Sequence, residues 1–387
     1  MIKDREDAFD VSARNLFLNC AGCSPGDRVL IIYETENDGY YDNLLVHDLE
    51  QAVQRLGMQS FTHGVPLQRT VCDPDTSLSN KMASVDCTVF LARLGDQIRF
   101  RTENASKRQI VSYALDRDMF VSEFGRTHYA AFDQLNWVLN QAISHARDIQ
   151  VTCPLGTDFK GTTPQIASSG DTTRKRFPVS VSAPVPSTTF RGKIAQSGFL
   201  TGTGSHYYIP YCCALDDTLM VHFDGHRITG FDGSEKDVKA ARGHYEFVGR
   251  TYGIDTYFVH SWHAGIHPGL RYDHFAGDNT ERWSGGAFGN PRVLHFHTCG
   301  AYPPGEISLN VVDPTVSLDG VAVWENGRLH PERVAGGSEI LRDFSDMAAV
   351  FANPCDGIGL AQDGRLRMHH PLVNELNTPS GAIRETA

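Results

Sequence analysis

Over the first 150 residues, short apolar runs alternate with stretches in which apolar residues recur at helical spacing. Residues 29–33 form a continuous apolar run after a turn, which is typical of a strand buried on both faces. Residues 41–56 have helical spacing, and Gly57 follows them as a C-terminal cap. The same alternation predicts strands at 59–62, 87–92 and 110–115 and helices at 78–82 and 132–147. Alternating strands and helices favour an open, mostly parallel sheet.

Beyond residue 150 the helical spacing fades, and turns rich in Gly, Ser, Thr and Pro separate short β-branched or aromatic runs. Asp224-Gly225 and Asn326-Gly327 predict hairpin turns. We expect a surface loop at 157–186, one late helix at 341–351 and a frayed tail after residue 372. The pattern as a whole predicts an α/β N-terminal domain at 1–150 and a β-rich α+β C-terminal domain at 151–387.

Composition and charge narrow the class of protein. The chain has 387 residues, 41% of them hydrophobic, and a formal net charge of -11. Such an acidic chain is a poor partner for nucleic acid, which needs clustered Lys and Arg. We expect no membrane span, because the chain contains no continuous apolar run of about 20 residues. The charged N-terminus does not resemble a secretory signal, and the nine scattered cysteines are typical of reduced thiols. We therefore expect a cytoplasmic protein.

The seventeen histidines are unevenly spread. The stretch 259–269 carries His260, His263 and His267, and the stretch 294–300 carries His295 and His297. Residues i and i+2 of a strand face the same side, so His295 and His297 are expected to point together and to be able to hold one ion. Imidazole suits Fe, Zn, Cu or Ni, and two histidines with one carboxylate are typical of non-haem Fe(II) oxygenases. Glu306, shortly after, supplies a candidate carboxylate.

Other motifs are weaker. His222 and Asp224 have ligand-like spacing but run into a predicted hairpin turn. Cys20 and Cys23 have zinc-ligand spacing, although no second pair follows at a suitable distance. The adjacent residues 212 and 213, both Cys, are best explained by ordinary packing. The sequence lacks the glycine-rich nucleotide-binding motifs and the nucleophile elbow of serine hydrolases.

Several segments in order resemble the thermophilic aminopeptidase T family of metallopeptidases, and more closely its relative 2,5-dihydroxypyridine 5,6-dioxygenase. They are the first strand at 26–31, the Gly-Thr-Asp-Phe segment at 156–159, the His-to-Pro segment at 260–268 and the last core hairpin, which ends at 316–320. Phe199 stands where the peptidases, which hold two ions, have a glutamate ligand. The resemblance therefore implies a site for one metal ion, in the C-terminal domain.

The resemblance also implies a ligand set and a chemistry. We expect His260, Glu306 and one or both of His295 and His297 to bind Fe(II), with His263 as a rival ligand to His260. His263 or His267 is expected to act as the acid or base. The ion would bring O₂ beside a hydroxylated aromatic or N-heterocyclic small molecule. Trp262, Tyr272 and Phe296 are candidates for the wall that holds the flat ring. A homo-oligomer is likewise implied.

Two alternatives stay open. A single Zn²⁺ in place of iron would make the protein a hydrolase that activates water. A degenerate site would make it a non-catalytic small-molecule binder.

Overall fold

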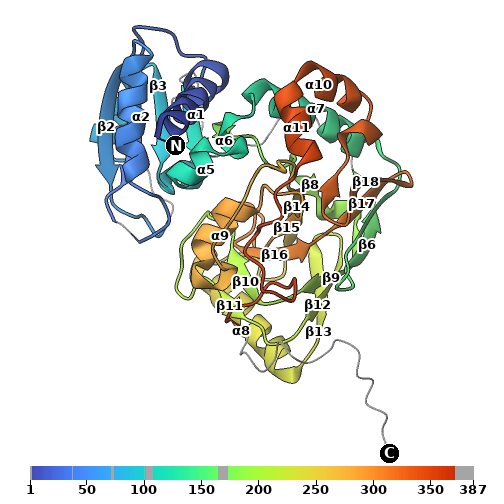
Figure 1. The fold of residues 1–387 in the computed structure, drawn as a ribbon. Helices are drawn as coiled ribbons and strands as arrows, with labels where there is room; N and C mark the ends of the chain where they lie inside the picture. Colours follow the sequence, from blue (N-terminus) through green and yellow to red (C-terminus); the bar gives the residue numbers. More distant parts are fainter. Residues whose placement is uncertain are drawn as a thin grey trace, which may run out of the picture.

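In the computed structural model the described residues are 2–36, 38–70, 74–99, 101, 108–163 and 173–370. The chain forms a smaller N-terminal lobe, blue to teal in Figure 1, and a larger lobe built mainly of antiparallel strands. This arrangement confirms the predicted fold class, an α/β part followed by a β-rich α+β part. The expected tail after residue 372 lies outside the described residues. None of the described helices combines the length and apolar character needed to cross a bilayer.

The N-terminal lobe is built on a five-stranded, all-parallel sheet. Its strands, in spatial order, are β2 (Gln59–Val65), β1 (Arg28–Glu34), β3 (Cys87–Leu91), β4 (Arg108–Ser112) and β7 (Lys175–Phe177). Side chains alternate between its two faces, so Val29 and Ile31 pack in one core while Leu30 and Ile32 pack in the other. Both faces of β1 are therefore buried, as its continuous apolar run predicts.

Helices cover both faces of this sheet. One face packs against α1 (Ile2–Arg14), a π-helical turn (Asn15–Cys20), α2 (Leu44–Arg55), α5 (Arg117–Val121) and α6 (Glu123–Arg126). The other face packs against α3 (Thr76–Ala83) and α4 (Leu94–Gln97). The predicted helices at 41–56 and 78–82 thus exist, with shifted ends.

The larger lobe contains two antiparallel sheets that pack face to face. The six-stranded sheet has the order β11 (Cys213–Ala214), β10 (Phe199–Gly202), β16 (Ile307–Val312), β15 (Val293–Thr298), β14 (Val259–Ala264) and β8 (Val185–Pro186). The eight-stranded sheet has the order β13 (Arg227–Asp232), β12 (Leu219–Asp224), β9 (Arg191–Gln196), β6 (Asp158–Gly161), β5 (Ile149–Thr152), β17 (Thr315–Leu318), β18 (Val321–Glu325) and β19 (Arg328–Leu329). Aromatic rings from both sheets interlock between them.

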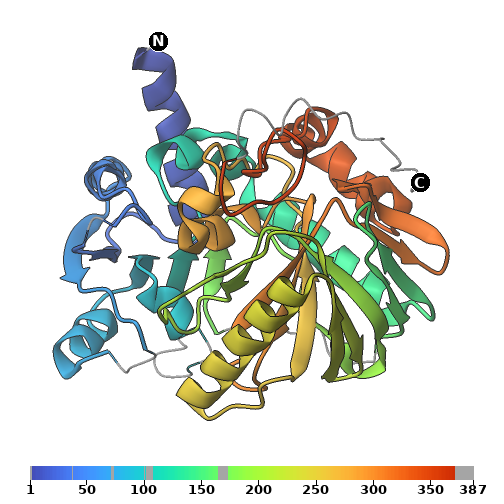
Figure 2. The same cartoon turned by 90° about the horizontal axis from the view of Figure 1, so that it is seen from below.

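Five longer helices complete the larger lobe. They are α7 (Tyr129–His145), α8 (Glu235–Tyr252), α9 (Thr280–Ala287), α10 (Gly337–Asp343) and α11 (Ser345–Ala352). Figure 2 shows α8 in the foreground beside the strands, and its apolar residues join their core. Single-turn 3-10 segments lie at Ser187–Thr189, Ala276–Asp278 and Pro331–Arg333.

Two expectations about elements are wrong. The predicted loop at 157–186 contains β6, β7 and β8, and β7 returns to pair with β4 in the parallel sheet. The predicted single helix at 341–351 is two helices, because the backbone turns out of the helical region at Phe344 (φ -123°, ψ 90°). Both predicted hairpins are present, as β12–β13 and β18–β19.

Candidate metal centre

The central strands of the six-stranded sheet have one apolar and one polar face. In the antiparallel register His263 of β14 pairs with His295 of β15, and Asn310 of β16 pairs with His295 from the other side. His297 lies between Ser261 and Ser308 in the same way. Directly paired residues project from the same face of a sheet, so the register gathers these polar side chains together. The alternate residues point to the apolar core between the two sheets.

Three imidazoles converge on this polar face. His263, His295 and His297 each offer a nitrogen, and these three nitrogens lie within 4.8 Å of one another. The rings of His263 and His295 are nearly parallel, at 6°, with centroids 5.0 Å apart. His297 is 5.0 Å from His263 and 5.4 Å from His295 by the same measure. Within the described ranges, this is the one group of three or more His, Cys, Asp or Glu side chains that can hold a metal ion.

Backbone carbonyls orient two of the three rings. His263 Nδ1 donates to the carbonyl of Ser182 at 3.0 Å, and His297 Nδ1 donates to the carbonyl of Pro304 at 2.6 Å. A carbonyl can only accept, so the proton of each ring is on Nδ1 and the lone pair is on Nε2. Histidines that bind metals are commonly held in this way, through the other ring nitrogen. The two rings are therefore prepared to bind an ion through Nε2.

The third ring, that of His295, has a buried nitrogen without a hydrogen-bond partner. His295 Nδ1 is buried and has no hydrogen-bond partner among the described residues. The ring of Phe288 stacks on His295 at 4.2 Å and holds its plane. Buried polar atoms without a partner are rare in proteins, and the binding of an ion is one of their common explanations. The residues present thus fit a metal ion.

Burial keeps all three imidazoles uncharged. The pKa of His263 is lowered to about 3, mainly by burial and to a smaller extent by the positive charges of Arg176 and Arg99. The pKa values of His295 and His297 lie well below the ordinary value for histidine. Burial is the main cause, and the repulsion between neighbouring protonated rings is the second. A metal ion requires the neutral, unprotonated nitrogen, so the group is ready to bind at neutral pH.

A cavity of about 80 Å³ opens onto the three rings, between the two lobes. Part of its wall comes from segments that follow the carboxyl ends of parallel strands: Tyr40 after β1, Asp96 and Arg99 after β3, and Tyr113 after β4. Ligands of open α/β sheets bind at this edge, close to the point where the strand order reverses. Here the order reverses between β1 and β3. The cavity thus lies between the carboxyl-end edge of the parallel sheet, where ligands of such sheets bind, and the face of the six-stranded sheet that carries the three histidines.

Polar contacts hold this wall in place. The Tyr113 hydroxyl donates to Asp96 Oδ1 at 2.6 Å. Arg99 donates to the Asp96 carbonyl at 2.6 Å and to the Ser205 hydroxyl at 3.1 Å. Burial, followed by the charge of Asp96, raises the pKa of Tyr113, so its hydroxyl stays protonated.

Two of the expected ligands lie outside the three-imidazole group. The Glu306 carboxylate is buried immediately before β16, and its Oε1 is 3.0 Å from Nδ1 of His206. Burial raises the pKa of Glu306, while His206 lowers it. His260 is half-buried, and its Nδ1 is 2.8 Å from the hydroxyl of Ser261.

The expected acid–base and ring-binding residues, apart from His263, do not line the cavity. His267 stacks on Phe132 at 3.7 Å, and its Nδ1 accepts from the backbone N–H of Gly269. Trp262 and Phe296 are fully buried between the sheets of the larger lobe. Tyr272 is buried in a separate cluster beside α9.

The weaker motifs also stay apart from the centre. His222 Nε2 lies 2.7 Å from Asp232 across the β12–β13 hairpin, rather than binding Asp224. Cys20 is buried, which raises its pKa to about 12 and makes it an inert thiol. Phe199 packs edge-on against Trp283, with ring centroids 5.4 Å apart.

Comparison with known proteins supports the fold. No protein-family model matches the chain, and no curated protein matches it in sequence. The structure of 2,5-dihydroxypyridine dioxygenase from Pseudomonas putida KT2440 matches with a TM-score of 0.58 and 15% identity, over 84% of this chain and 97% of that one. AmpT from Thermus thermophilus matches with a TM-score of 0.47 and 11% identity, over 84% and 99% of the two chains. The chain therefore shares the fold of the dioxygenase, which confirms the resemblance at the level of fold.

Proposed function

We propose that the chain is an enzyme with one metal ion, which His263, His295 and His297 bind. The observation that supports this most strongly is the convergence of three uncharged imidazoles on one point, with two of them oriented by backbone carbonyls. The proposal exchanges His260 for its rival His263 and removes Glu306 from the ligand set, because the Glu306 carboxylate lies beside His206.

The favoured reaction is an O₂-dependent oxidation of a small hydroxylated aromatic or N-heterocyclic ring, with Fe(II) as the ion. Two arguments support it. The solved structure with the same fold at a TM-score of 0.58 is a dioxygenase. Imidazole ligands suit iron, and three of them leave coordination positions for two further ligands. A bound ion would supply Lewis acidity, lowering the pKa of a coordinated ring hydroxyl.

The protein's own residues would position the ring and exclude water. Phe288, Tyr40 and Tyr207 give the cavity aromatic walls, against which a flat ring can stack. The pair of Tyr113 and Asp96 can hold a proton at the Tyr113 hydroxyl, at the wall of the cavity. This pair replaces His267 in our assignment, because His267 is packed between Phe132 and its neighbours, outside the cavity.

A zinc hydrolase is the second candidate. Three histidines with an open fourth position also form a known catalytic zinc site, in which bound water becomes the nucleophile. The same three imidazoles favour this function, and the identity of the ion decides between the two.

The deciding experiment starts from protein purified without oxygen. We expect about one equivalent of iron per chain, and oxygen consumption when a panel of dihydroxylated benzenes and pyridines is added. The His297→Ala variant should lose the bound iron and the oxygen consumption. The His222→Ala variant, changed in the exposed β12–β13 hairpin, should keep the iron and the oxygen consumption. Tightly bound zinc with hydrolysis of amides or esters, and no oxygen uptake, would favour the hydrolase instead.

A further inference from the structure

Three cysteines of the N-terminal lobe are buried in the core on one face of its parallel sheet. Cys20 and Cys23, the pair with zinc-ligand spacing, precede β1, and Cys87 is the first residue of β3. The thiols of Cys23 and Cys87 are hydrogen-bonded to each other. Within the described part of the chain, the three sulfurs do not meet as a group that can hold a metal ion. The contact between Cys23 and Cys87 therefore indicates a different chemistry.

The register of the sheet brings an arginine to these two thiols. Cys87 is directly paired with Arg108 of β4, and paired residues of neighbouring strands project from the same face. Arg108 donates to the sulfur of Cys23 and, at 2.6 Å, to Oδ2 of Asp27. The same Asp27 oxygen accepts from the backbone N–H of Ser24, at 3.0 Å. The turn that carries Cys23 thus also carries the carboxylate that holds the Arg108 guanidinium beside it.

The three thiols differ in chemical character. The hydrogen bond with Cys87 lowers the pKa of Cys23, and the positive charge of Arg108 lowers it as well, while burial and the charge of Asp27 act in the opposite direction. The pKa of Cys87 lies well above its ordinary value, first because of the hydrogen bond with Cys23 and then because of burial. The thiolate is the reactive form of cysteine, and neighbouring cationic groups favour it. Cys23 is therefore the nucleophile of the group, and Cys87 is the thiol that faces it.

The position of Cys23 suits a small reagent. Its side chain is 6% exposed, whereas Cys87 is fully buried. Ser24 and Pro25, the next two residues along the chain, are exposed. A molecule of the size of hydrogen peroxide would therefore meet Cys23 first, with Cys87 behind it.

We propose that Cys23 and Cys87 are a peroxide-reactive pair, which hydrogen peroxide converts to a disulfide. The sulfur of Cys23 attacks one peroxide oxygen, the O–O bond breaks, and the departing hydroxide takes up the proton that Cys23 released. The sulfur of Cys87 then attacks the sulfur of the Cys23 sulfenic acid. The S–O bond breaks, the hydroxide leaves as water with the proton of Cys87, and the S–S bond forms. Two electrons thus pass from the two thiols to the peroxide.

The test exposes the full-length protein, reduced and then freed of metal with a chelator, to dilute hydrogen peroxide. Chelation prevents iron from producing radicals, and it makes the outcome independent of the proposed metal function. Peptide mapping by mass spectrometry should find a cross-link between Cys23 and Cys87 that a thiol reductant removes. We expect Cys23 to be oxidised at least about 10-fold faster than Cys355, a half-buried thiol whose pKa is raised by burial.

Variants assign the roles. In Cys87→Ser, the sulfenic acid of Cys23 should persist and be trapped by dimedone. Arg108→Gln should slow the oxidation of Cys23 by about three-fold or more, since it removes the neighbouring cation. Arg55→Gln, which breaks an exposed ion pair with Asp10 in the same lobe, is the matched control and should leave the rate unchanged. Circular dichroism checks that each variant folds.

Oxidation of Cys355 in the wild-type protein before Cys23 would overturn the proposal, whatever the variants do. A disulfide between Cys20 and Cys23 would overturn the role given to Cys87. Equal rates in Arg108→Gln and Arg55→Gln would overturn the role given to Arg108.

Discussion

His260 is the extra residue of an irregularity in β14, where the register shifts between Val259 and Ser261. After it, His263 pairs directly with His295 and comes onto the polar face of the sheet. His263 comes three positions after His260, so the two point to opposite faces of a regular strand, and their spacing alone does not settle which of them is on the polar face. His295 and His297 are two positions apart, and this spacing alone predicts that they share a face. The structure places both on one face as predicted.

Protonation of a buried histidine gives a prediction at this scale. His244 of α8 is buried, and burial lowers its pKa to about 4. In the unfolded chain its pKa is near 6.5. Below that pH the imidazole is therefore protonated in the unfolded state but stays neutral in the folded state. His244 should therefore contribute stability at neutral pH that is lost as pH falls from about 6.5 towards 4.

The His244→Leu variant should lose less stability on acidification than the wild type does. Between pH 7 and pH 5 we expect the difference to be about 2 kcal/mol in the free energy of unfolding by urea. His222→Leu, on the exposed β12–β13 hairpin, serves as the control. A parallel fall in wild type and His244→Leu would mean that this imidazole is protonated in the folded protein.

At the scale of elements, strands that bury both faces and hairpins with Asp-Gly or Asn-Gly turns could be predicted from local sequence. Segments whose structure depends on distant partners could not. Residues 175–177 of β7 are Lys-Arg-Phe, which has no strand pattern. They form a strand only because they pair with the edge of β4. The helix α8 could have been predicted, because its buried residues Ala241, His244, Tyr245 and Val248 recur at helical spacing among charged ones, as in an amphipathic helix.

The loop that precedes β16 gives a second prediction. Gly305 has a left-handed backbone (φ +58°), and a Cβ there would lie 2.5 Å from the backbone carbon of His297. The neighbouring Pro304 carbonyl orients the His297 ring. Gly305→Ala should therefore push this carbonyl away and weaken metal binding by about 10-fold or more, as loss of an orienting partner commonly does.

Gly320→Ala separates this effect from backbone strain alone. Gly320 also has a positive φ (+84°), but a Cβ there meets no atom within 4 Å. We expect it to cost about 1–2 kcal/mol of stability and no metal affinity. Calorimetric titration of both variants with Fe(II) or Zn²⁺ checks this, and equal affinities would refute the role of the Pro304 carbonyl.

At the scale of the whole molecule, the cavity exists because two lobes meet. Its charged wall comes from the parallel-sheet lobe, at positions between 96 and 176, and its imidazoles come from the six-stranded sheet, at positions 263–297. The sequence indicated the histidines through their local excess. Asp96, Arg99, Tyr113 and Arg176 gave no comparable signal, although their position near the ends of parallel strands is one that ligands favour. Their convergence follows from tertiary packing.

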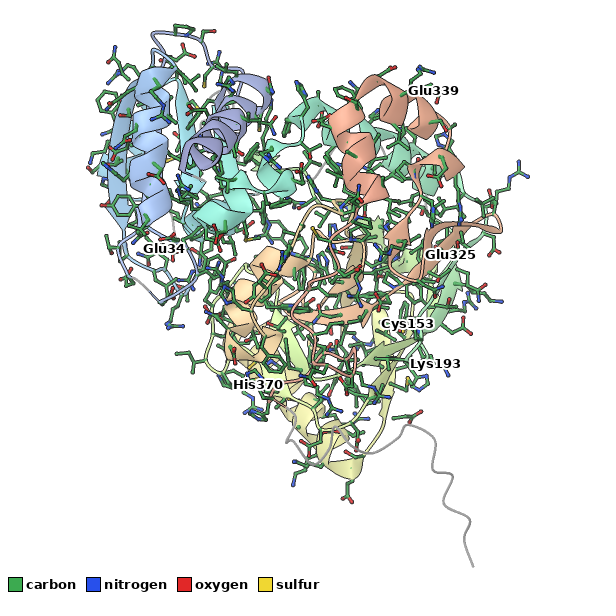
Figure 3. The ribbon with its side chains drawn as sticks, viewed as in Figure 1. Glu34, Cys153, Lys193, Glu325, Glu339 and His370 are labelled. Carbon is green, nitrogen blue, oxygen red and sulfur yellow. The ribbon has the colours of Figure 1, made fainter. Side chains whose placement is uncertain are left out.

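The junction between the lobes depends on Arg93, which follows β3. It binds the buried Glu34 at 2.7 Å and also Glu281 of α9 at 2.7 Å. Glu34 lies at the end of the N-terminal lobe that approaches α9 (Figure 3). Arg282 of the same helix donates to the carbonyl of Tyr40 at 2.6 Å. These contacts hold α9 against the parallel sheet and thereby define the cavity.

Replacement of Arg93 should lower the stability of the fold. Arg93→Met leaves the carboxylate of Glu34 buried without a counter-charge, and we expect a loss of about 3–5 kcal/mol in the free energy of unfolding. Arg55→Met, which removes an exposed ion pair with Asp10, should cost less than about 1 kcal/mol. Urea unfolding measures both, and similar losses in the two variants would contradict the role given to Arg93.

Metal binding by single-histidine variants tests the central claim most directly. The wild-type protein should bind one divalent ion per chain in a calorimetric titration. His263→Ala, His295→Ala and His297→Ala should each weaken binding by more than about 100-fold, since loss of a ligand exceeds loss of an orienting partner. His260→Ala and Glu306→Ala should retain it. Loss of the ion in the His260 and Glu306 variants, with retention in the other three, would contradict the account.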